Sequence, residues 1–244
     1  MERRLQRSFF TTDALTLARA LLGKVLVHRT PLGMVKGIIT ETEAYMGVED
    51  KGSHTYQGKR TDRTEPMFHI GGTSYVYFIY GMYNCMNITA GDEDVPMAAL
   101  IRSVEPFDEE SRRIMEALRI RKLRKKSGAA EADTGAVEAD TGAAEADTGD
   151  AEVAGIQTEQ AACKASETIP QNVKRHLADG PGKLCIAMQI TKEDNDVDLV
   201  TSKEFYVTEG IEVEPAQILA GKRIGIDYAE EAADYLWRFT LRQQ

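Results

Sequence analysis

The pattern of hydrophobic and polar positions predicts a chain that mixes helices and strands. Thr11-Thr12-Asp13 offers capping side chains before Ala14–Leu22, a Leu- and Ala-rich stretch that predicts a helix ending at Gly23. Strands are predicted where β-branched and aromatic residues gather between turn residues. These predicted strands are Lys24–Thr30, Met34–Tyr45, Ser74–Tyr80, Tyr83–Thr89, Met97–Val104 and, as a buried strand, Tyr235–Leu241.

Turn and loop residues separate these segments. Pro31-Leu32-Gly33 joins the first two strands and predicts a hairpin. Residues 46–73 are polar and Gly-rich and predict a long loop, which at that length is usually functional or disordered. The remaining predictions are an amphipathic helix with a basic end at Phe107–Lys126, a short helix at Asn172–Ala178, and a turn at Gly180-Pro181-Gly182 before Lys183–Ile190.

A seven-residue repeat interrupts this pattern. EADTGAV, EADTGAA and EADTGDA follow one another over residues 131–151. Each unit contains a Gly and has no large apolar side chain, so the repeat is not a coiled coil and cannot bury a core. We predict a flexible acidic insert at about 127–170 within a single domain that spans 1–244, and we expect activity to survive its removal. The functional alternative for the insert is a nucleic-acid mimic or a docking tail.

The distribution of charge along the chain shows that the net charge excludes few kinds of partner. The whole chain carries −9, and residues 129–170 alone account for −9, so the rest is neutral overall with a basic N-terminal part. A DNA partner is therefore neither supported nor excluded by charge. No stretch approaches 18 consecutive apolar residues, which excludes a membrane-spanning helix. The three cysteines are odd in number and far apart, as expected in a reducing compartment.

The segment Glu41-Thr42-Glu43-Ala44-Tyr45 is the first candidate site. On a strand, Glu41, Glu43 and Tyr45 point to one face, because side chains alternate with a period of two. A carboxylate beside an aromatic ring suits a general base, since partial burial tunes its pKa. Taken alone, however, the pattern favours a solvated strand face.

An aromatic cluster is the second candidate. Tyr75, Tyr77, Phe78, Tyr80 and Tyr83 fall within nine residues. Rings on a strand can stack on a nucleobase, and a ring at a turn can wedge between base pairs. A tyrosine-rich sheet core is the equal alternative.

Isolated polar residues form the third candidate. Asn87 and Arg102 lie within otherwise apolar strands, so Arg102 is expected to contact an acid or a ligand. His54 and His69 lie 15 residues apart, and no Cys or His has the spacing of metal ligands. The sequence therefore predicts no metal site.

Order and spacing make these weak signals specific. The motifs are ETEAY (41–45), His54, MF (67–68), YVYFIYGMYNCMNI (75–88), LIR (100–102), EP (105–106) and GPGKLC (180–185). Together they resemble the alkyladenine (3-methyladenine, or methylpurine) DNA glycosylase family over roughly residues 7–110 and 171–240. The resemblance implies an α+β fold: one compact domain with a curved, mostly antiparallel β-sheet flanked by helices.

The resemblance also implies a role for each matching residue. Glu43 matches the general base that activates water, and Arg102 matches an arginine beside that water. Tyr45, His54 and Tyr77 match the residues of the family's base-binding pocket that enclose a flipped base. Asn87 matches the pocket residue that opposes the 2-amino group of guanine. Tyr80 matches the residue that intercalates into DNA.

The implied activity is hydrolysis of the N-glycosidic bond of damaged purines: 3-methyladenine, 7-methylguanine, hypoxanthine or ethenoadenine. The implied partner is double-stranded DNA with a damaged purine, and no cofactor and no membrane partner is implied. No lysine matches a family nucleophile, so no strand cleavage is expected. We expect an intracellular, DNA-associated monomer.

Two alternatives stay open. A catalytically silent DNA-damage binder would use the same tyrosines without needing Glu43. A carbohydrate glycosidase would use Glu41 and Glu43 as a carboxylate pair.

Overall fold

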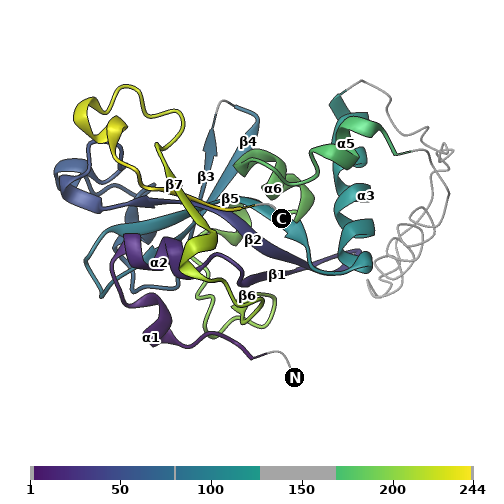
Figure 1. The fold of residues 1–244 in the computed structure, drawn as a ribbon, viewed down its shortest axis with the longest axis horizontal. Coiled ribbons are helices and arrows are strands. Elements are labelled where there is room, and N and C mark those ends of the chain that lie inside the picture. Colours follow the sequence, from purple (N-terminus) through teal and green to yellow (C-terminus); the bar gives the residue numbers. More distant parts are fainter. Residues whose placement is uncertain (1–2, 80, 127–168, 243–244) are drawn as a thin grey trace, which may run out of the picture.

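The computed structural model describes residues 3–79, 81–126 and 169–242. Within these residues, eight strands form one curled sheet in which neighbouring strands are antiparallel (Figure 1). The order is β3–β4–β5–β2–β1–β6, while β8 pairs with β2 and β7. The strands are β1 (Val25–Thr30), β2 (Gly33–Tyr45), β3 (Ser74–Ile79), β4 (Tyr83–Ala90), β5 (Met97–Pro106), β6 (Phe205–Thr208), β7 (Ile218–Gly221) and β8 (Arg238–Leu241).

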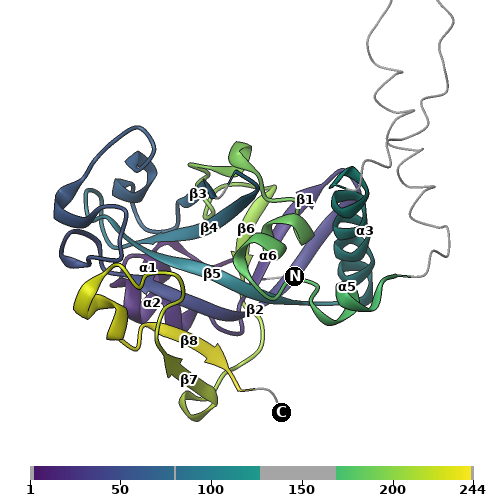
Figure 2. The same cartoon turned by 90° about the horizontal axis from the view of Figure 1, so that it is seen from above.

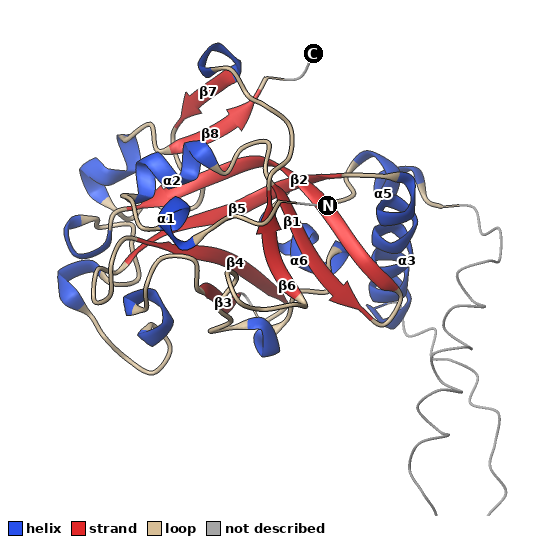
Figure 3. Ribbon diagram, turned by 90° about the horizontal axis from the view of Figure 1, so that it is seen from below, coloured by secondary structure: helices blue, strands red, loops and turns tan. Residues whose placement is uncertain are grey.

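Helices cover both faces of this sheet. In Figures 2 and 3, α1 and α2 lie on one face and α6 on the other, while α3 and α5 lie together at one end. The α-helices are α1 (Arg7–Phe10), α2 (Ala14–Ala20), α3 (Glu109–Lys126), α5 (Gln171–Arg175) and α6 (Pro181–Ala187). The short 3-10 helices are η1 (Gly47–Glu49), η2 (Tyr56–Gly58), η3 (Glu65–Phe68), η4 (Lys192–Asp194), η5 (Pro215–Gln217) and η6 (Glu230–Asp234).

Strand β2 organises the sheet because it changes neighbours along its length. Residues 33–38 pair with β1, whereas Glu41–Glu43 pair with β8. On its other edge β2 pairs with β5, and the register shifts around Glu41. Fully buried apolar side chains from both faces and from the helices fill the core, including Phe10, Leu17, Leu26, Ile39, Met86, Ile101, Phe205 and Phe239.

The predicted α+β class with a curved antiparallel sheet is confirmed, as are the first hairpin and the cap of α2. The Asp13 carboxylate accepts hydrogen bonds from the amides of Leu15 at 2.9 Å and Thr16 at 3.0 Å. Gly23 has a φ of +81°, and the helix has already ended at Ala20. The chain therefore ends this helix where local signals predict it, to within two residues.

Two predictions need correction. The predicted buried strand Tyr235–Leu241 is wrong in its first half, because only Arg238–Leu241 is a strand and Leu236 is 54% exposed. Residues 46–73 are not one irregular loop but contain η1, η2 and η3. Helices of three or four residues leave no hydrophobic period in a sequence, so the pattern could not predict them.

Two predictions fall wholly or mostly outside the described residues. The acidic insert predicted at about 127–170 coincides with 127–168, and Tyr80 is also outside them. The single-domain prediction for 1–244 therefore stays a prediction. No described helix combines the length and the apolar character that a membrane crossing requires.

Candidate active site

Strand β2 separates the residues of ETEAY onto two faces, as its period requires. The Thr42 side chain is buried toward α2, where its hydroxyl donates to the Ala18 carbonyl at 2.7 Å. Glu41, Glu43 and Tyr45 lie on the opposite face, where they contact one another or the same partner. The predicted alternation is confirmed, and the two carboxylates share one side of the sheet.

Glu43 is buried, with a side chain that is 0% exposed. Its carboxylate accepts from the Tyr45 hydroxyl at 2.9 Å and from the Ile224 amide at 2.8 Å, and it lies 3.2 Å from Nη1 of Arg102. A carboxylate offers about four acceptor positions, and these contacts account for three of them. The expectation of a solvated strand face is wrong for Glu43.

Burial gives this carboxyl group an unusual titration. Desolvation raises the pKa of Glu43, and the nearby Arg102 guanidinium opposes part of that rise. Burial, with Glu43 beside it, raises the pKa of Tyr45 well above its usual range, so its hydroxyl stays protonated and donates. Glu43 is thus a carboxylate whose affinity for a proton is higher than that of an exposed glutamate.

Arg102 connects the two glutamates. Its Nε donates to Glu41 at 3.0 Å, while Nη1 contacts Glu43. Glu41 also accepts from Nη1 of Arg238 on β8 at 3.1 Å. Arg102 therefore contacts acids, as expected of an arginine in an apolar strand, and it also lines the cavity described next.

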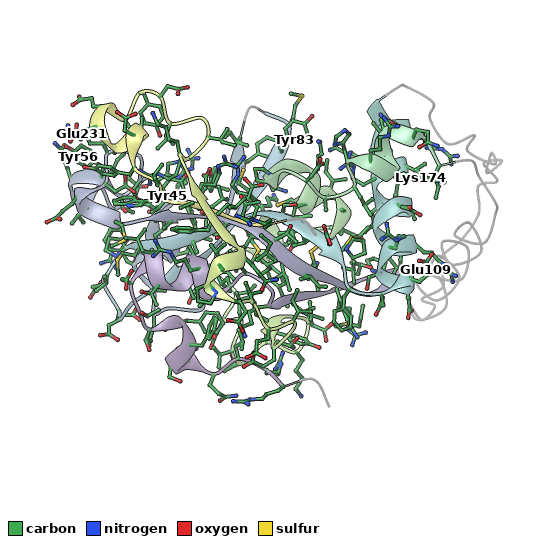
Figure 4. All side chains as sticks on the ribbon, viewed as in Figure 1. Tyr45, Tyr56, Tyr83, Glu109, Lys174 and Glu231 are labelled. Carbon is green, nitrogen blue, oxygen red and sulfur yellow. The ribbon has the colours of Figure 1, made fainter. Side chains whose placement is uncertain are left out.

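A cavity of about 370 Å³ lies beside this face of the sheet. Five predicted site residues line it: Tyr45, His54, Tyr77, Asn87 and Arg102. Tyr45 and Tyr83, another lining residue, lie on the same side of the sheet in Figure 4. Glu43 does not line the cavity but lies directly behind Tyr45 and Arg102, which both do.

His54 faces a hydroxyl on the floor of this site. Its Nδ1 lies 3.0 Å from the Tyr75 hydroxyl. Burial, with Arg63 and Lys59 nearby, lowers the pKa of His54 to about 4, so the ring is neutral at neutral pH. Arg63 also interacts with the Tyr75 hydroxyl, so the imidazole and its partner both lie near this guanidinium.

The aromatic cluster divides between core and cavity. Tyr75 is 2% exposed and packs in the core, but it also lines the cavity, as does Tyr77, whose ring centroid lies 4.6 Å from that of His54. Asn87 is held in place because its side-chain amide donates to the Tyr75 carbonyl at 3.0 Å. Part of the cluster is therefore buried in the core, as one interpretation predicts, and its stacking role stays a prediction.

The β3–β4 hairpin extends from the cavity toward its tip. Ile79 and Tyr83, the strand residues next to the turn, line the cavity. Tyr80 itself lies outside the described residues. Its neighbours Phe78 and Met82 have exposed fractions of 58% and 50%, so the end of the hairpin presents apolar side chains.

Sequence analysis missed the wall formed by residues 222–228. Arg223 donates two hydrogen bonds to Asp50, at 2.5 and 2.7 Å, and both side chains are 0% exposed. This pair fixes the segment in which Ile224 contacts Glu43 and, with Tyr228, lines the cavity. Residues 223–228 (RIGIDY) contain no motif of known spacing. The signal that could have indicated this wall is an arginine, Arg223, next to apolar residues.

The structure also explains GPGKLC. Gly180 has a φ of +125° and precedes α6, and Gly182 lies against the Tyr83 ring at the cavity wall. A Cβ on Gly182 would come within 2.9 Å of Cγ of Tyr83. Only glycine allows this approach, so the motif shapes the cavity through its backbone.

Within the described ranges, no group of three or more His, Cys, Asp or Glu side chains could hold a metal ion. The site chemistry there consists of a buried carboxylate, paired arginines and an aromatic cavity. A buried carboxylate with a raised pKa beside a cavity is typical of a general base in an enzyme.

Comparisons with known proteins identify the class of enzyme. The profile of the family described as Methylpurine-DNA glycosylase (MPG) matches residues 8–135 and 150–244. Relatives from Clostridium perfringens (strain SM101) and Clostridium acetobutylicum are 39% and 38% identical over 98% of this chain, covering 96% and 94% of their own lengths. A relative from Desulfitobacterium hafniense is 39% identical over 98% of this chain and 95% of its own. All three are named "Putative 3-methyladenine DNA glycosylase".

The chain therefore belongs to the methylpurine-DNA glycosylase family and is a DNA glycosylase, a hydrolase of N-glycosyl bonds. The family resemblance seen in the motifs is confirmed. The roles of individual residues remain predictions, and the geometry above supports them.

Proposed function

We propose that this enzyme removes damaged purines of the 3-methyladenine, 7-methylguanine, hypoxanthine and ethenoadenine type from double-stranded DNA. The damaged nucleotide leaves the duplex and enters the cavity, because its glycosidic bond cannot be reached inside the stack. Water activated by Glu43 then attacks C1′, releasing the base and leaving an abasic site. The cavity volume of about 370 Å³ falls within the range of small-molecule sites.

Each cavity residue has a part in this proposal. Tyr45, His54 and Tyr77 enclose the flipped base, as rings from two strands and a loop can do. Asn87, fixed by its bond to the Tyr75 carbonyl, opposes the 2-amino group of guanine. Tyr80 fills the gap left in the duplex.

The observation that carries the proposal is the environment of Glu43. Its three partners hold the carboxylate behind the cavity wall. Arg102 reaches both this carboxylate and the cavity, so it lies where it can orient the attacking water. Its charge also keeps Glu43 from being an isolated buried anion.

Lysine chemistry has no support in the cavity. Among the described residues that line it, none is a lysine. We propose a monofunctional enzyme in which water, rather than a protein amine, attacks the sugar, and which therefore does not cleave the strand. We also propose that it works as a monomer on DNA inside the cell and needs no cofactor.

Single-turnover base release tests the proposal. Duplexes that each contain one hypoxanthine, ethenoadenine or methylated purine are mixed with excess enzyme. We expect free base and an abasic site that breaks only after alkali treatment. Strand breakage without alkali contradicts the monofunctional mechanism. Tight lesion binding without release favours the silent binder, and neither binding nor release contradicts the proposed function.

The carbohydrate glycosidase has no structural support. Glu41 and Glu43 both contact Arg102 from the same strand face, so they do not oppose each other across a cleft. The family match is to DNA glycosylases.

Glu41→Gln is expected to lower the rate constant of base release by about ten-fold, since it weakens one charge-assisted bond to Arg102. Glu43→Gln should lower the same rate constant far more, because it removes the base itself. Single-turnover excision of hypoxanthine measures both variants. Equal losses would contradict the assignment and favour a mechanism with two carboxylates.

The excision rate is expected to fall at acid pH. Because burial raises the pKa of Glu43, protonation begins at a pH higher than for an exposed glutamate, and the protonated form cannot accept a proton from water. The rate should rise as pH increases through this pKa and then level off. A pH series of single-turnover rates measures it. Residual excision by Glu43→Gln should lack this acid limb; an identical limb would assign the titration to another group.

A further inference from the structure

Both tyrosines proposed to stack on the base have a guanidinium beside the ring. The Arg223 guanidinium carbon lies 4.8 Å from the ring centroid of Tyr45, and that of Arg63 lies 5.4 Å from the ring centroid of Tyr77. Neither arginine lines the cavity, although both tyrosines do. The two cations therefore approach the rings from outside the space that a base would occupy.

The two arginines differ in how firmly they are held. Arg223 is buried and bonded to Asp50, so it is part of the framework. Arg63 is exposed, and it comes from the loop between η2 and η3. Arg63 can therefore be replaced without removing a buried charge.

The lowered pKa of His54 shows the effect of these charges on the electrostatic potential at the cavity wall. After burial, the charges of Arg63 and then Lys59 are what lower the pKa of this ring to about 4. The other groups that contact the imidazole, Tyr75 and Tyr77, have pKa values raised by burial and are uncharged at neutral pH. A potential that opposes a positive imidazole at this wall also opposes a positively charged purine there.

We propose that Arg63 determines specificity by base charge: it acts through Tyr77 to disfavour cationic N-methylated purines relative to uncharged ones such as hypoxanthine. A cation attracts the electron-rich face of an aromatic ring. Because the Arg63 guanidinium already interacts with the Tyr77 ring, that ring attracts a cationic base less strongly. The positive charge of Arg63 also repels the cationic base directly. This inference rests on the proposed function, and it concerns selectivity among lesions rather than the hydrolysis itself.

Arg63→Gln tests the inference, with Arg60→Gln as the matched control. Arg60 lies in the same loop and is also an exposed arginine beside an aromatic ring. That ring belongs to Phe68, which does not line the cavity. Both variants thus remove one positive charge from the same loop, but only Arg63→Gln removes it from a cavity ring.

The readout is a ratio of single-turnover rate constants, 7-methylguanine over hypoxanthine. We expect Arg63→Gln to raise this ratio by about three- to five-fold, as the loss of one exposed cation–ring interaction predicts. Arg63→Lys should stay close to wild type, and Arg60→Gln should leave the ratio unchanged. A ratio unchanged in Arg63→Gln, or raised equally by Arg60→Gln, overturns the inference while leaving the proposed function intact.

A second readout does not depend on activity. In an NMR titration, the pKa of His54 should rise in Arg63→Gln, because the cation with the larger effect on this ring is gone, and it should stay low in Arg60→Gln. An unchanged pKa of His54 in Arg63→Gln would overturn the inference. Wild-type enzyme that releases neither base would overturn the proposed function and this inference together.

Discussion

Glu43→Gln is expected to reduce the single-turnover rate constant for base release by about 10²–10⁴-fold, the range that general-base catalysis contributes. The substitution keeps the shape of the side chain and can still contact Tyr45 and Arg102, but an amide does not take a proton from water. The measurement is release of hypoxanthine from a duplex by excess enzyme at neutral pH.

Lesion binding and folding are the controls for this variant. Glu43→Gln should bind a lesion duplex as tightly as wild type and should unfold at a similar temperature or higher, because a buried charge that burial penalises has been neutralised. A variant that binds normally and still releases base within a few-fold of the wild-type rate would remove Glu43 from the mechanism. Water would then be activated elsewhere in the cavity.

Asp50→Ala is expected to lower the free energy of unfolding by about 3–5 kcal/mol, because it leaves the buried Arg223 guanidinium without its counter-charge. Base release should fall as well, since Arg223 holds the segment that supplies the Ile224 amide to Glu43. Urea denaturation measures the first effect and single-turnover excision the second.

Lys51→Gln is the matched control for Asp50→Ala. Lys51 is the next residue along the chain and pairs with Glu230 and Glu231, whose side chains are 71% and 59% exposed. Glu231, labelled in Figure 4, lies in η6 with Glu230. Solvated ion pairs contribute little, so the urea midpoint should hardly move. Equal shifts of the urea midpoint in the two variants would mean that the buried pair contributes no more to stability than the exposed pairs.

Local patterns predicted those parts of the fold that depend on neighbours in the chain. The cap at Asp13, the hairpin at Pro31-Leu32 and the alternation through Glu41–Tyr45 all follow from a few adjacent residues. The motif spacing then implied the residues that line the cavity, because a family preserves the order of its site residues.

Contacts made across the chain could not be predicted in the same way. The burial of Glu43 depends on Tyr45 nearby but also on Ile224, which is 181 positions later. The pairing of Arg223 with Asp50 spans 173 positions, and neither residue belongs to a local pattern. Such pairings are decided by the closure of the whole sheet, so a strand face that looks solvated in sequence became a buried site.

Because β2 pairs with β8 as well as with β1, the site is assembled late in the synthesis of the chain. Glu43 lies on a strand made early, but Arg238 and the Ile224 amide belong to the last part of the chain to be synthesised. A nascent chain that ends before β7 contains Glu43, Tyr45 and Tyr77 but not the 222–228 wall that lies beside them in the folded protein. The hydrogen bonds that the Ile224 amide and Arg238 make to Glu43 and Glu41 can therefore form only after the last strands have been synthesised.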